Sequence, residues 1–197
     1  MEREELLKDM SAYVKGLFTT FANPLLLYHN LAHTQQVVKH AKEIAGHCMV
    51  EEELLFVLLT AAWFHDTGHL WGEMATHEER GVKIMQAYCR DKGVDEGAIE
   101  VIGQAIMATR MPVKPVTLVE MILCDADTYH LGTPEFRKMD ALVWQELELR
   151  LQTTFNRKRQ FTLRFIEGHN FYTAYCRALL GQQKEENIRL LKAGLPA

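Results

Sequence analysis

The chain has 197 residues, 48% of them apolar, which fits one substantial hydrophobic core better than two. Its net charge is -4 at pH 7, and its basic residues are scattered apart from Asn156-Arg-Lys-Arg-Gln160. This distribution excludes a protein that binds long DNA or RNA through the phosphate backbone.

The amino-terminal segment, residues 1–9, is charged throughout and lacks the basic start and apolar stretch of a secretory signal. We therefore expect a cytoplasmic protein. The apolar run at residues 53–64 is shorter than the roughly 20 residues that span a bilayer, so we expect no membrane partner. The sequence contains four cysteines, Cys48, Cys89, Cys124 and Cys176. They lack a Cys-x-x-Cys spacing, which disfavours a disulfide framework or a thiolate zinc site.

Apolar residues recur with helical spacing along the chain. The first stripe consists of Leu6, Met10, Tyr13, Val14 and Leu17, and the second of Val37, Val38, Ala41, Ile44 and Ala45. Residues 53–64 are apolar nearly all round, which predicts a buried helix. No strand pattern with a period of two competes with these helices, so we predict an all-α protein.

Turn-forming residues divide the chain into about nine helices of ordinary length. These breaks fall at Asn23-Pro24, 68–72, 91–93, 111–115 and 132–134. The last third continues the helical pattern without a linker rich in serine or glycine. We therefore predict one domain that spans residues 1–197.

Residues with metal-ligand chemistry occur first in the segment Tyr28-His-Asn-Leu-Ala-His33. Asn30 is a preferred N-cap residue, so it predicts a helix that begins at Leu31. His33 then lies in the first turn of this helix, and His29 lies just outside it.

The adjacent residues His65 and Asp66 follow at the end of the apolar run, before Gly68 as a helix breaker. A buried imidazole and carboxylate are costly to desolvate unless something compensates them, and a divalent metal does so. Two antiparallel helices would bring this pair close to His33. A lone His-Asp pair more often caps a helix end, but three separate ligand groups in one chain favour a metal site.

The third group of ligand residues, Asp125 and Asp127, leaves two alternatives. These positions lie about 200° apart on a helix, so only one of them can face a metal. Asp125 follows Ile122 and Leu118 by three and seven residues, and this spacing from two apolar positions favours Asp125.

The order of these groups resembles the HD superfamily of metal-dependent phosphohydrolases over about residues 26–135. Phe64-His-Asp-Thr-Gly-His69 and Asp125-Ala-Asp-x-x-x-Leu131-Gly132 look like the small bacterial HD phosphohydrolases. Tyr28-His-Asn-x-x-His33 is also similar to the start of the cyclic-nucleotide phosphodiesterase signature. The resemblance implies a single helical HD-domain bundle with additional C-terminal helices, residues 136–192, packed on the metal-site core.

The ligand set that the resemblance implies is His33, His65, Asp66 and Asp127. Asp127 is preferred over Asp125 because the family's ligand is the aspartate after the alanine, and Asp125 is then expected to orient a ligand histidine. Imidazoles combined with carboxylates suit Mn²⁺, Fe²⁺, Ni²⁺, Co²⁺, Mg²⁺ or Zn²⁺, and they do not select one of these ions.

The reaction implied is hydrolysis of a phosphoester or phosphoanhydride by a water that the metal activates. The family analogy points to a small phosphorylated substrate, a nucleotide above all. His29 corresponds to the residue that protonates the leaving oxygen in phosphodiesterases, although it could equally hydrogen-bond a loop. His69 and Arg110 are candidates for contacts with the phosphate.

Two further histidines bear on the number of metals and on the extent of the site. His77 could join His69 at a second metal, but it also suits the start of a helix after Thr76. Binuclear relatives commonly carry a histidine in the helix that here reads residues 101–110, and this stretch has none. His169 is expected to be a hydrogen-bonded loop residue. An HD-type di-iron oxygenase and a catalytically silent nucleotide-binding sensor are the alternative functions.

Overall fold

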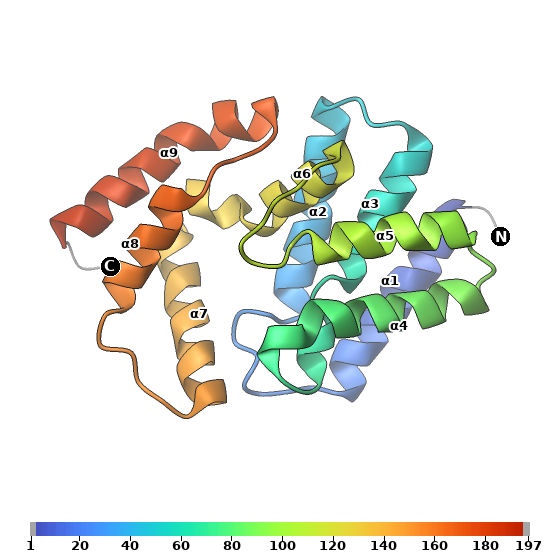
Figure 1. Cartoon of the computed structure of the whole chain (residues 1–197), viewed down its shortest axis with the longest axis horizontal. Coiled ribbons are helices and arrows are strands. Elements are labelled where there is room, and N and C mark those ends of the chain that lie inside the picture. Colours follow the sequence, from blue (N-terminus) through green and yellow to red (C-terminus); the bar gives the residue numbers. More distant parts are fainter. Residues whose placement is uncertain (1–2, 195–197) are drawn as a thin grey trace.

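The computed structural model describes residues 3–194, which contain nine α-helices, three short 3-10 helices and no strand (Figure 1). The α-helices are α1 Arg3–Thr20, α2 Leu31–His47, α3 Glu52–Phe64, α4 His77–Asp91, α5 Glu96–Met107, α6 Leu118–Asp127, α7 Phe136–Leu151, α8 Lys158–Gly168 and α9 Ala174–Ala193. The 3-10 helices are η1 Thr67–Leu70, η2 Met74–Thr76 and η3 Tyr129–Gly132. The predicted all-α class is therefore confirmed.

The predicted breaks all fall at or between the ends of α-helices. Asn23-Pro24 lies between α1 and α2, for example, and residues 111–115 lie between α5 and α6. Three further breaks, after α2, α7 and α8, contain neither glycine nor proline. Two of them have a left-handed residue, Met49 after α2 with a φ of 52° and Gln152 after α7 with a φ of 49°. A left-handed backbone at such residues is uncommon, so residue type alone does not predict these turns.

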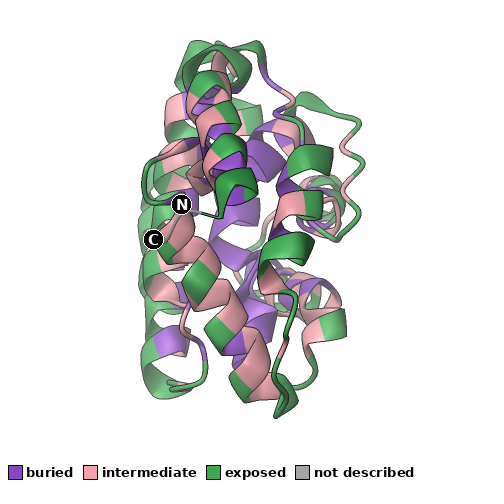
Figure 2. Ribbon diagram, turned by 90° about the vertical axis from the view of Figure 1, so that its left-hand side faces the viewer, coloured by how far each residue is buried: buried purple, intermediate pink, exposed green. Residues whose placement is uncertain are grey.

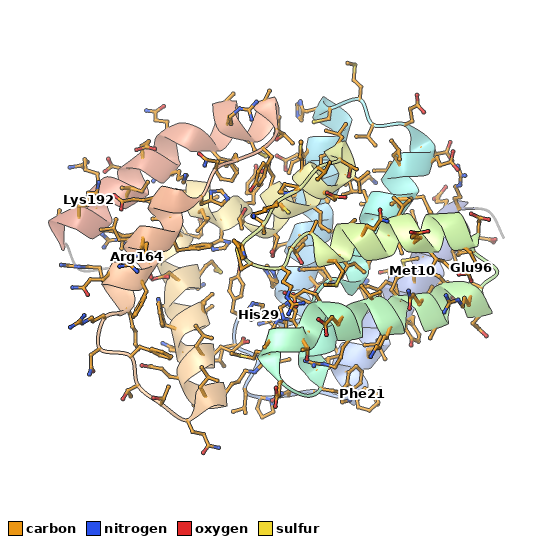
Figure 3. The ribbon with its side chains drawn as sticks, viewed as in Figure 1. Met10, Phe21, His29, Glu96, Arg164 and Lys192 are labelled. Atoms are coloured by element: carbon orange, nitrogen blue, oxygen red, sulfur yellow. The ribbon has the colours of Figure 1, made fainter. Side chains whose placement is uncertain are left out.

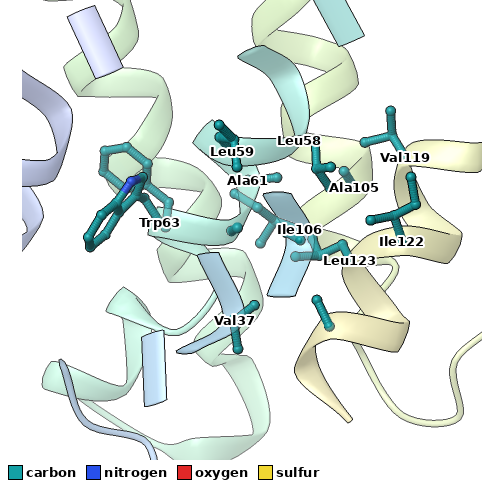
Figure 4. Close-up of a cluster of buried hydrophobic side chains, with 14 of the residues drawn as sticks. Val37, Leu58, Leu59, Ala61, Trp63, Ala105, Ile106, Val119, Ile122 and Leu123 are labelled. Carbon is teal, nitrogen blue, oxygen red and sulfur yellow. The ribbon is translucent and has the colours of Figure 1, made fainter. Parts of the chain in front are cut away.

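Helix α3 runs through the middle of the fold and is buried on every side, as its apolar sequence predicts. All its residues from 56 to 64 are buried, and the helix packs against α1, α2, α5 and α6. Figure 4 shows side chains of α3 among those of α2, α5 and α6, and Figure 2 shows the buried residues enclosed by exposed ones. No helix within residues 3–194 combines the length and hydropathy that crossing a bilayer requires. The packing of α3 carries the polar pair that follows it, His65 and Asp66, into the interior.

Helices α7, α8 and α9 lie at one end of the molecule, at the left in Figure 1. Helix α9 packs against η3 and α8. Within α9, the amide of Asn187 donates to the carbonyl oxygens of Leu131 and Thr133, both at 2.9 Å. The hydrophobic core continues into the C-terminal helices through Phe136 and Ile166. These helices are therefore joined to the amino-terminal ones by shared apolar packing as well as by hydrogen bonds.

A glycine allows α4 to pack closely on the end of α3. A Cβ atom on Gly81 would lie 2.8 Å from the carbonyl oxygen of Phe64, which is too short for a non-bonded contact. The close approach places the start of α4, and with it His77, beside His65 and Asp66.

Candidate metal centre

The four predicted ligand residues meet between α2, α3 and α6. His33 lies in the first turn of α2, His65 and Asp66 directly follow α3, and Asp127 ends α6. His33 Nε2 lies 3.0 Å from Asp127 Oδ1 and 3.3 Å from Asp66 Oδ2. His65 Nε2 lies 3.3 Å from Asp66 Oδ2 and 3.6 Å from Asp127 Oδ1. The two imidazoles and two carboxylates therefore face a common point.

Local hydrogen bonds orient the two imidazoles. Asn30 caps α2 as predicted, because its side-chain oxygen accepts from the backbone N–H of His33 at 3.1 Å. The Nδ1 atom of His65 donates to the carbonyl oxygen of Ala62 at 2.9 Å, which leaves the lone pair on Nε2 of the neutral ring. His65 is thus held in the tautomer that a metal ligand needs.

Polar atoms in this cluster lack protein partners although they are buried. His65 Nε2 and Asp66 Oδ2 are shielded from solvent and form no hydrogen bond within the described part of the chain. Burial disfavours the charged form of His33, but the hydrogen bond to Asp127 and the nearby carboxylate of Asp66 outweigh this effect and raise the pKa of His33 to about 9. A divalent cation would replace the extra proton that this raised pKa keeps on His33, and it would compensate the negative charge of both carboxylates. This donor set therefore fits a metal ion.

Asp125 and Asp127 have different roles in the structure. Asp125 Oδ1 accepts from the backbone N–H of Tyr172 at 2.7 Å, and its Oδ2 accepts from the backbone N–H and the hydroxyl of Thr173 at 2.8 and 2.7 Å. The expectation that Asp125 orients a ligand histidine is therefore wrong, because its carboxylate holds the loop before α9. The mild preference that helical spacing gave to Asp125 as a ligand is wrong for the same reason.

A second group of side chains faces the other oxygen of Asp66. His69 Nε2 and His77 Nε2 each lie 3.8 Å from Asp66 Oδ1. His77 Nε2 also lies 3.4 Å from Oε1 of Glu78, a buried residue that the sequence analysis did not identify. Ring nitrogens of His29 and His69 and an oxygen of Asp66 lie within 4.8 Å of one another. Asp66 therefore stands between two clusters of possible ligands.

His77 occupies the helix start considered for it from the sequence and also lies beside Asp66. It begins α4, and its Nδ1 donates to the carbonyl oxygen of Met74 at 2.7 Å, so that Nε2 is directed to Asp66. The expected capping by Thr76 is absent, because the Thr76 hydroxyl pairs with Arg80 and makes no cap hydrogen bond. The helix start itself therefore positions a site residue.

Helix α7 contributes Glu146, which the sequence analysis missed. Its carboxylate is 1% exposed and accepts from Nδ1 of His29 at 2.7 Å and from the backbone N–H groups of Tyr28 and His29 at 2.8 and 3.0 Å. Burial opposes its ionisation, but the hydrogen bond and charge of His29 lower the pKa of Glu146 to about 2. Glu146 thus fixes the His29 ring, which lies near the middle of the molecule in Figure 3.

Arg150, one turn further along α7, fixes the tautomer of His69. Its Nη1 donates to His69 Nδ1 at 2.8 Å and to Glu146 Oε1 at 3.0 Å. A guanidinium has only donors, so Nδ1 of His69 accepts and the proton of the neutral ring lies on Nε2. Burial and the neighbouring charge of His29 hold the pKa of His69 well below its usual range. His69 therefore presents an N–H donor, and not a lone pair, to the space beside Asp66.

Arg110 and His169, which were considered from the sequence, lie outside the cluster of ligand residues. The exposed guanidinium of Arg110 donates to Glu79 Oε1 at 2.7 Å and to the carbonyl oxygen of Ala75 at 3.4 Å. The structure does not bring Arg110 together with the ligand residues, so its predicted contact with phosphate gains no support from its position. His169 Nε2 lies 3.0 Å from the hydroxyl of Thr128, as expected of a hydrogen-bonded loop histidine.

Two cavities open onto the cluster, and Asp127 lines both. One has a volume of about 610 Å³ and is also lined by His33, Lys39 and Lys138. The other has a volume of about 390 Å³, is also lined by His29, and lies among aromatic side chains of α7 and α8. Both volumes are typical of small-molecule sites, so a small substrate can reach the cluster.

Comparisons with known proteins agree with this geometry. The family model for the HD domain matches residues 30–132, which include His33, His65, Asp66 and Asp127. A crystal structure of a predicted HD superfamily hydrolase from an uncultured Thermotogales bacterium shares the fold, with a TM-score of 0.63. The two chains are 20% identical, and the match covers 98% of this chain and 97% of the other. No match was found among the curated proteins.

Proposed function

Because this chain belongs to the HD-domain family, we propose that it is a metal-dependent phosphohydrolase that acts on a nucleotide or another small phosphoester. The observation that carries the proposal is the convergence of two histidines and two aspartates beside the pair formed by His29 and Glu146. The first group suits a divalent metal, and the second suits proton transfer. Hydrolysis of a phosphoester uses both.

His33, His65, Asp66 and Asp127 would hold the metal. When bound there, a divalent ion lowers the pKa of a coordinated water toward neutrality and polarises a phosphoryl oxygen. The protein fixes the ligand atoms on three helix ends, so they need little rearrangement before substrate binds.

His29 is the proposed acid that protonates the leaving oxygen. Its Nδ1–H donates to Glu146, so a second proton, on Nε2, makes the ring a cation that the buried carboxylate stabilises. The proton passes from Nε2 to the oxygen of the departing alcohol, and the neutral ring keeps its hydrogen bond to Glu146. Glu146 positions His29 and does not itself transfer a proton.

His69 is the proposed donor to a phosphoryl oxygen. Arg150 keeps the proton of the His69 ring on Nε2. This atom is shielded from solvent and has no hydrogen-bond partner in the described residues. A fixed donor of this kind stabilises negative charge without reorganisation during the reaction. Lys39 and Lys138, which line the larger cavity, supply positive charge for the rest of an anionic substrate.

The experiment that tests the function is a panel of nucleotides, p-nitrophenyl phosphate and bis(p-nitrophenyl) phosphate assayed with added Mn²⁺ or Co²⁺. We expect release of phosphate or of the alcohol, loss of turnover with a chelator, and recovery when metal is restored. His33→Ala should eliminate turnover, whereas His47→Ala, an exposed histidine that stacks on Tyr175, should retain it. A metal-loaded protein that is inert across the whole panel contradicts the proposal.

A specific observation also supports a second candidate, an HD-type di-iron oxygenase. Asp66 presents its two oxygens to two groups of histidines, and His77 directs Nε2 to one of them. Against it stands the proton that Arg150 imposes on Nε2 of His69, which removes one ligand from the second group. Two irons per chain, together with oxygen consumption in the presence of an organophosphonate or polyol, would favour the oxygenase.

A further inference from the structure

Half of the residues that line the smaller cavity beside the cluster follow the HD-domain match. Its lining includes His29 and Asp127 of the cluster, together with the aromatic side chains of Trp144 of α7 and of Phe161 and Phe165 of α8. The centroids of the Trp144 and Phe161 rings are 6.1 Å apart. Flat aromatic groups stack favourably on such walls. The cavity therefore suits a flat ring that is attached to the group reacting at His29.

Besides Asp127, the described residues that line this cavity contribute one other carboxylate, that of Asp140. Its Oδ1 accepts from the hydroxyl of Thr162 at 2.8 Å, and the oxygen of that hydroxyl accepts from Nε1 of Trp144 at 2.8 Å. An indole N–H can only donate and a carboxylate can only accept, so the direction of this chain is fixed. Asp140 forms no ion pair with a residue in the range 3–194, and its side-chain hydrogen bonds there come from Thr162 and Trp144. A carboxylate has about four acceptor positions, so Asp140 can still accept a hydrogen bond from a ligand.

The charge of the cavity restricts what binds there. No lysine or arginine of the described chain lines it, so an anionic group gains nothing from entering, and the phosphate stays at the histidines. Burial raises the pKa of Asp140, although the hydrogen bonds from Thr162 and Trp144 oppose this effect. A neutral ring with an N–H donor on its edge satisfies both the aromatic walls and the carboxylate.

We propose that this cavity binds the leaving-group part of the substrate, and that Asp140 selects a flat aromatic ring with an N–H donor, as in an amino-substituted nucleobase. The leaving group is the relevant part because His29, the proposed acid, lines the cavity. This inference rests on the proposed function for its chemistry, but the cavity's preference for a ring can be measured without any reaction.

The test compares two nucleosides that differ in one group, adenosine and purine riboside, which lacks the amino group. Binding to the full chain loaded with Mn²⁺ is measured by calorimetry, with quenching of tryptophan fluorescence as a second signal. We expect adenosine to bind about tenfold or more tightly than purine riboside, which is the scale of one hydrogen bond to a charged group. Neither nucleoside carries a phosphate, so neither is hydrolysed as a phosphoester.

Asp140→Asn tests the carboxylate without changing its shape. The Thr162 hydroxyl still donates to this side chain, so the amide oxygen turns toward Thr162 and the NH₂ group faces the ligand. The preference for adenosine should then disappear or reverse. Asp91→Asn is the matched control, because it makes the same change at an exposed residue that ends α4, outside both cavities, and should leave the preference intact.

Equal affinities for the two nucleosides, a preference that survives Asp140→Asn, or no binding of either nucleoside would overturn the inference. These outcomes are separate from the test of function. A protein that hydrolyses bis(p-nitrophenyl) phosphate but binds the nucleosides equally keeps the phosphohydrolase proposal and loses the selective cavity. Selective adenosine binding by a protein that is inert toward phosphoesters keeps the cavity and loses the hydrolase.

Discussion

Gly68 lies so close to His77 that a Cβ atom on Gly68 would overlap the carbonyl oxygen and carbon of His77. The contact is between backbone atoms, so no side chain can move to relieve it. It joins the segment after α3 directly to the first residue of α4, and His77 in turn directs Nε2 toward Asp66. The glycine that the sequence analysis interpreted as a helix breaker therefore also sets the distance between two parts of the site.

Gly68→Ala should displace the start of α4 and lower the free energy of unfolding by about 1–3 kcal/mol, the usual cost of overpacking. Urea unfolding followed by circular dichroism measures the change. Gly16→Ala is the control, because a Cβ there meets nothing within 4 Å and Gly16 lies inside α1. It should stabilise the protein by about 0.5–1 kcal/mol. Equal unfolding free energies for Gly68→Ala and the unmodified protein would disprove the packing argument.

Asp127→Asn and Asp125→Asn should affect different properties. Asp127→Asn should abolish metal binding, because Asp127 faces both His33 and His65. Asp125→Asn should leave the metal content of folded protein unchanged and lower the unfolding free energy by about 1–3 kcal/mol, since an amide cannot accept all the hydrogen bonds from Tyr172 and Thr173. Metal analysis and thermal unfolding separate the two effects, and metal loss in Asp125→Asn alone would reverse the assignment.

Three of the four candidate ligands could be predicted because they lie in short, local sequence patterns. Asn30 and His33 are three residues apart at a helix start, and His65 and Asp66 are adjacent at a helix end, so helix geometry alone places them. Asp127 needed the family pattern, because helical spacing favoured its neighbour. The spacing of residues within α6 does not reveal where α9 lies, and the loop before α9 is what binds the Asp125 carboxylate.

Glu146 and Arg150 could not be predicted in the same way. They are four residues apart on α7, which is typical of an ion pair on the surface of a helix. Their partners His29 and His69 lie 117 and 81 residues away in the sequence, and only the tertiary packing of α7 brings them together. The strongest signal in the sequence would have been a charged pair beside apolar residues on the same helix face, and this signal is weak.

Arg150→Met should release the tautomer of His69 and lower turnover without removing metal. Its effect on the ring is read from the ¹⁵N chemical shifts of His69, with the proton expected on Nε2 in the unmodified protein. Turnover should fall by about tenfold or more, as for other residues that orient site histidines. Arg150→Lys, which keeps one donor, should recover part of both signals, and Arg90→Met, a surface arginine paired with Glu96, should change neither. An unchanged His69 spectrum in Arg150→Met would refute the role of Arg150.

The pH dependence of metal binding follows from the protons that the metal replaces. Two carboxylates raise the pKa of His33 to about 9, so its ring is a cation at pH 7 in the metal-free protein, and they also raise the pKa of His65. A ligand nitrogen must be unprotonated, so metal affinity should increase between pH 6 and 8 by about tenfold per pH unit for each proton displaced. Calorimetry in buffers with different ionisation enthalpies counts these protons, and a pH-independent affinity without proton release would contradict the assignment of His33 and His65.

The same protons predict different trends in stability with and without metal. The pKa of His33 in the folded, metal-free protein, about 9, lies above the usual value of 6.5. This difference stabilises the fold fully below pH 6.5 and is lost as the pH rises to about 9, with a contribution of about 3 kcal/mol from His33. The metal-free protein should therefore become less stable from pH 6.5 to 9, whereas the Mn²⁺-loaded protein should keep nearly constant stability, because the rise in metal affinity offsets this loss. Thermal unfolding across this range, with and without Mn²⁺, checks the prediction, and parallel curves for the two forms would show that no proton on these histidines is exchanged for metal.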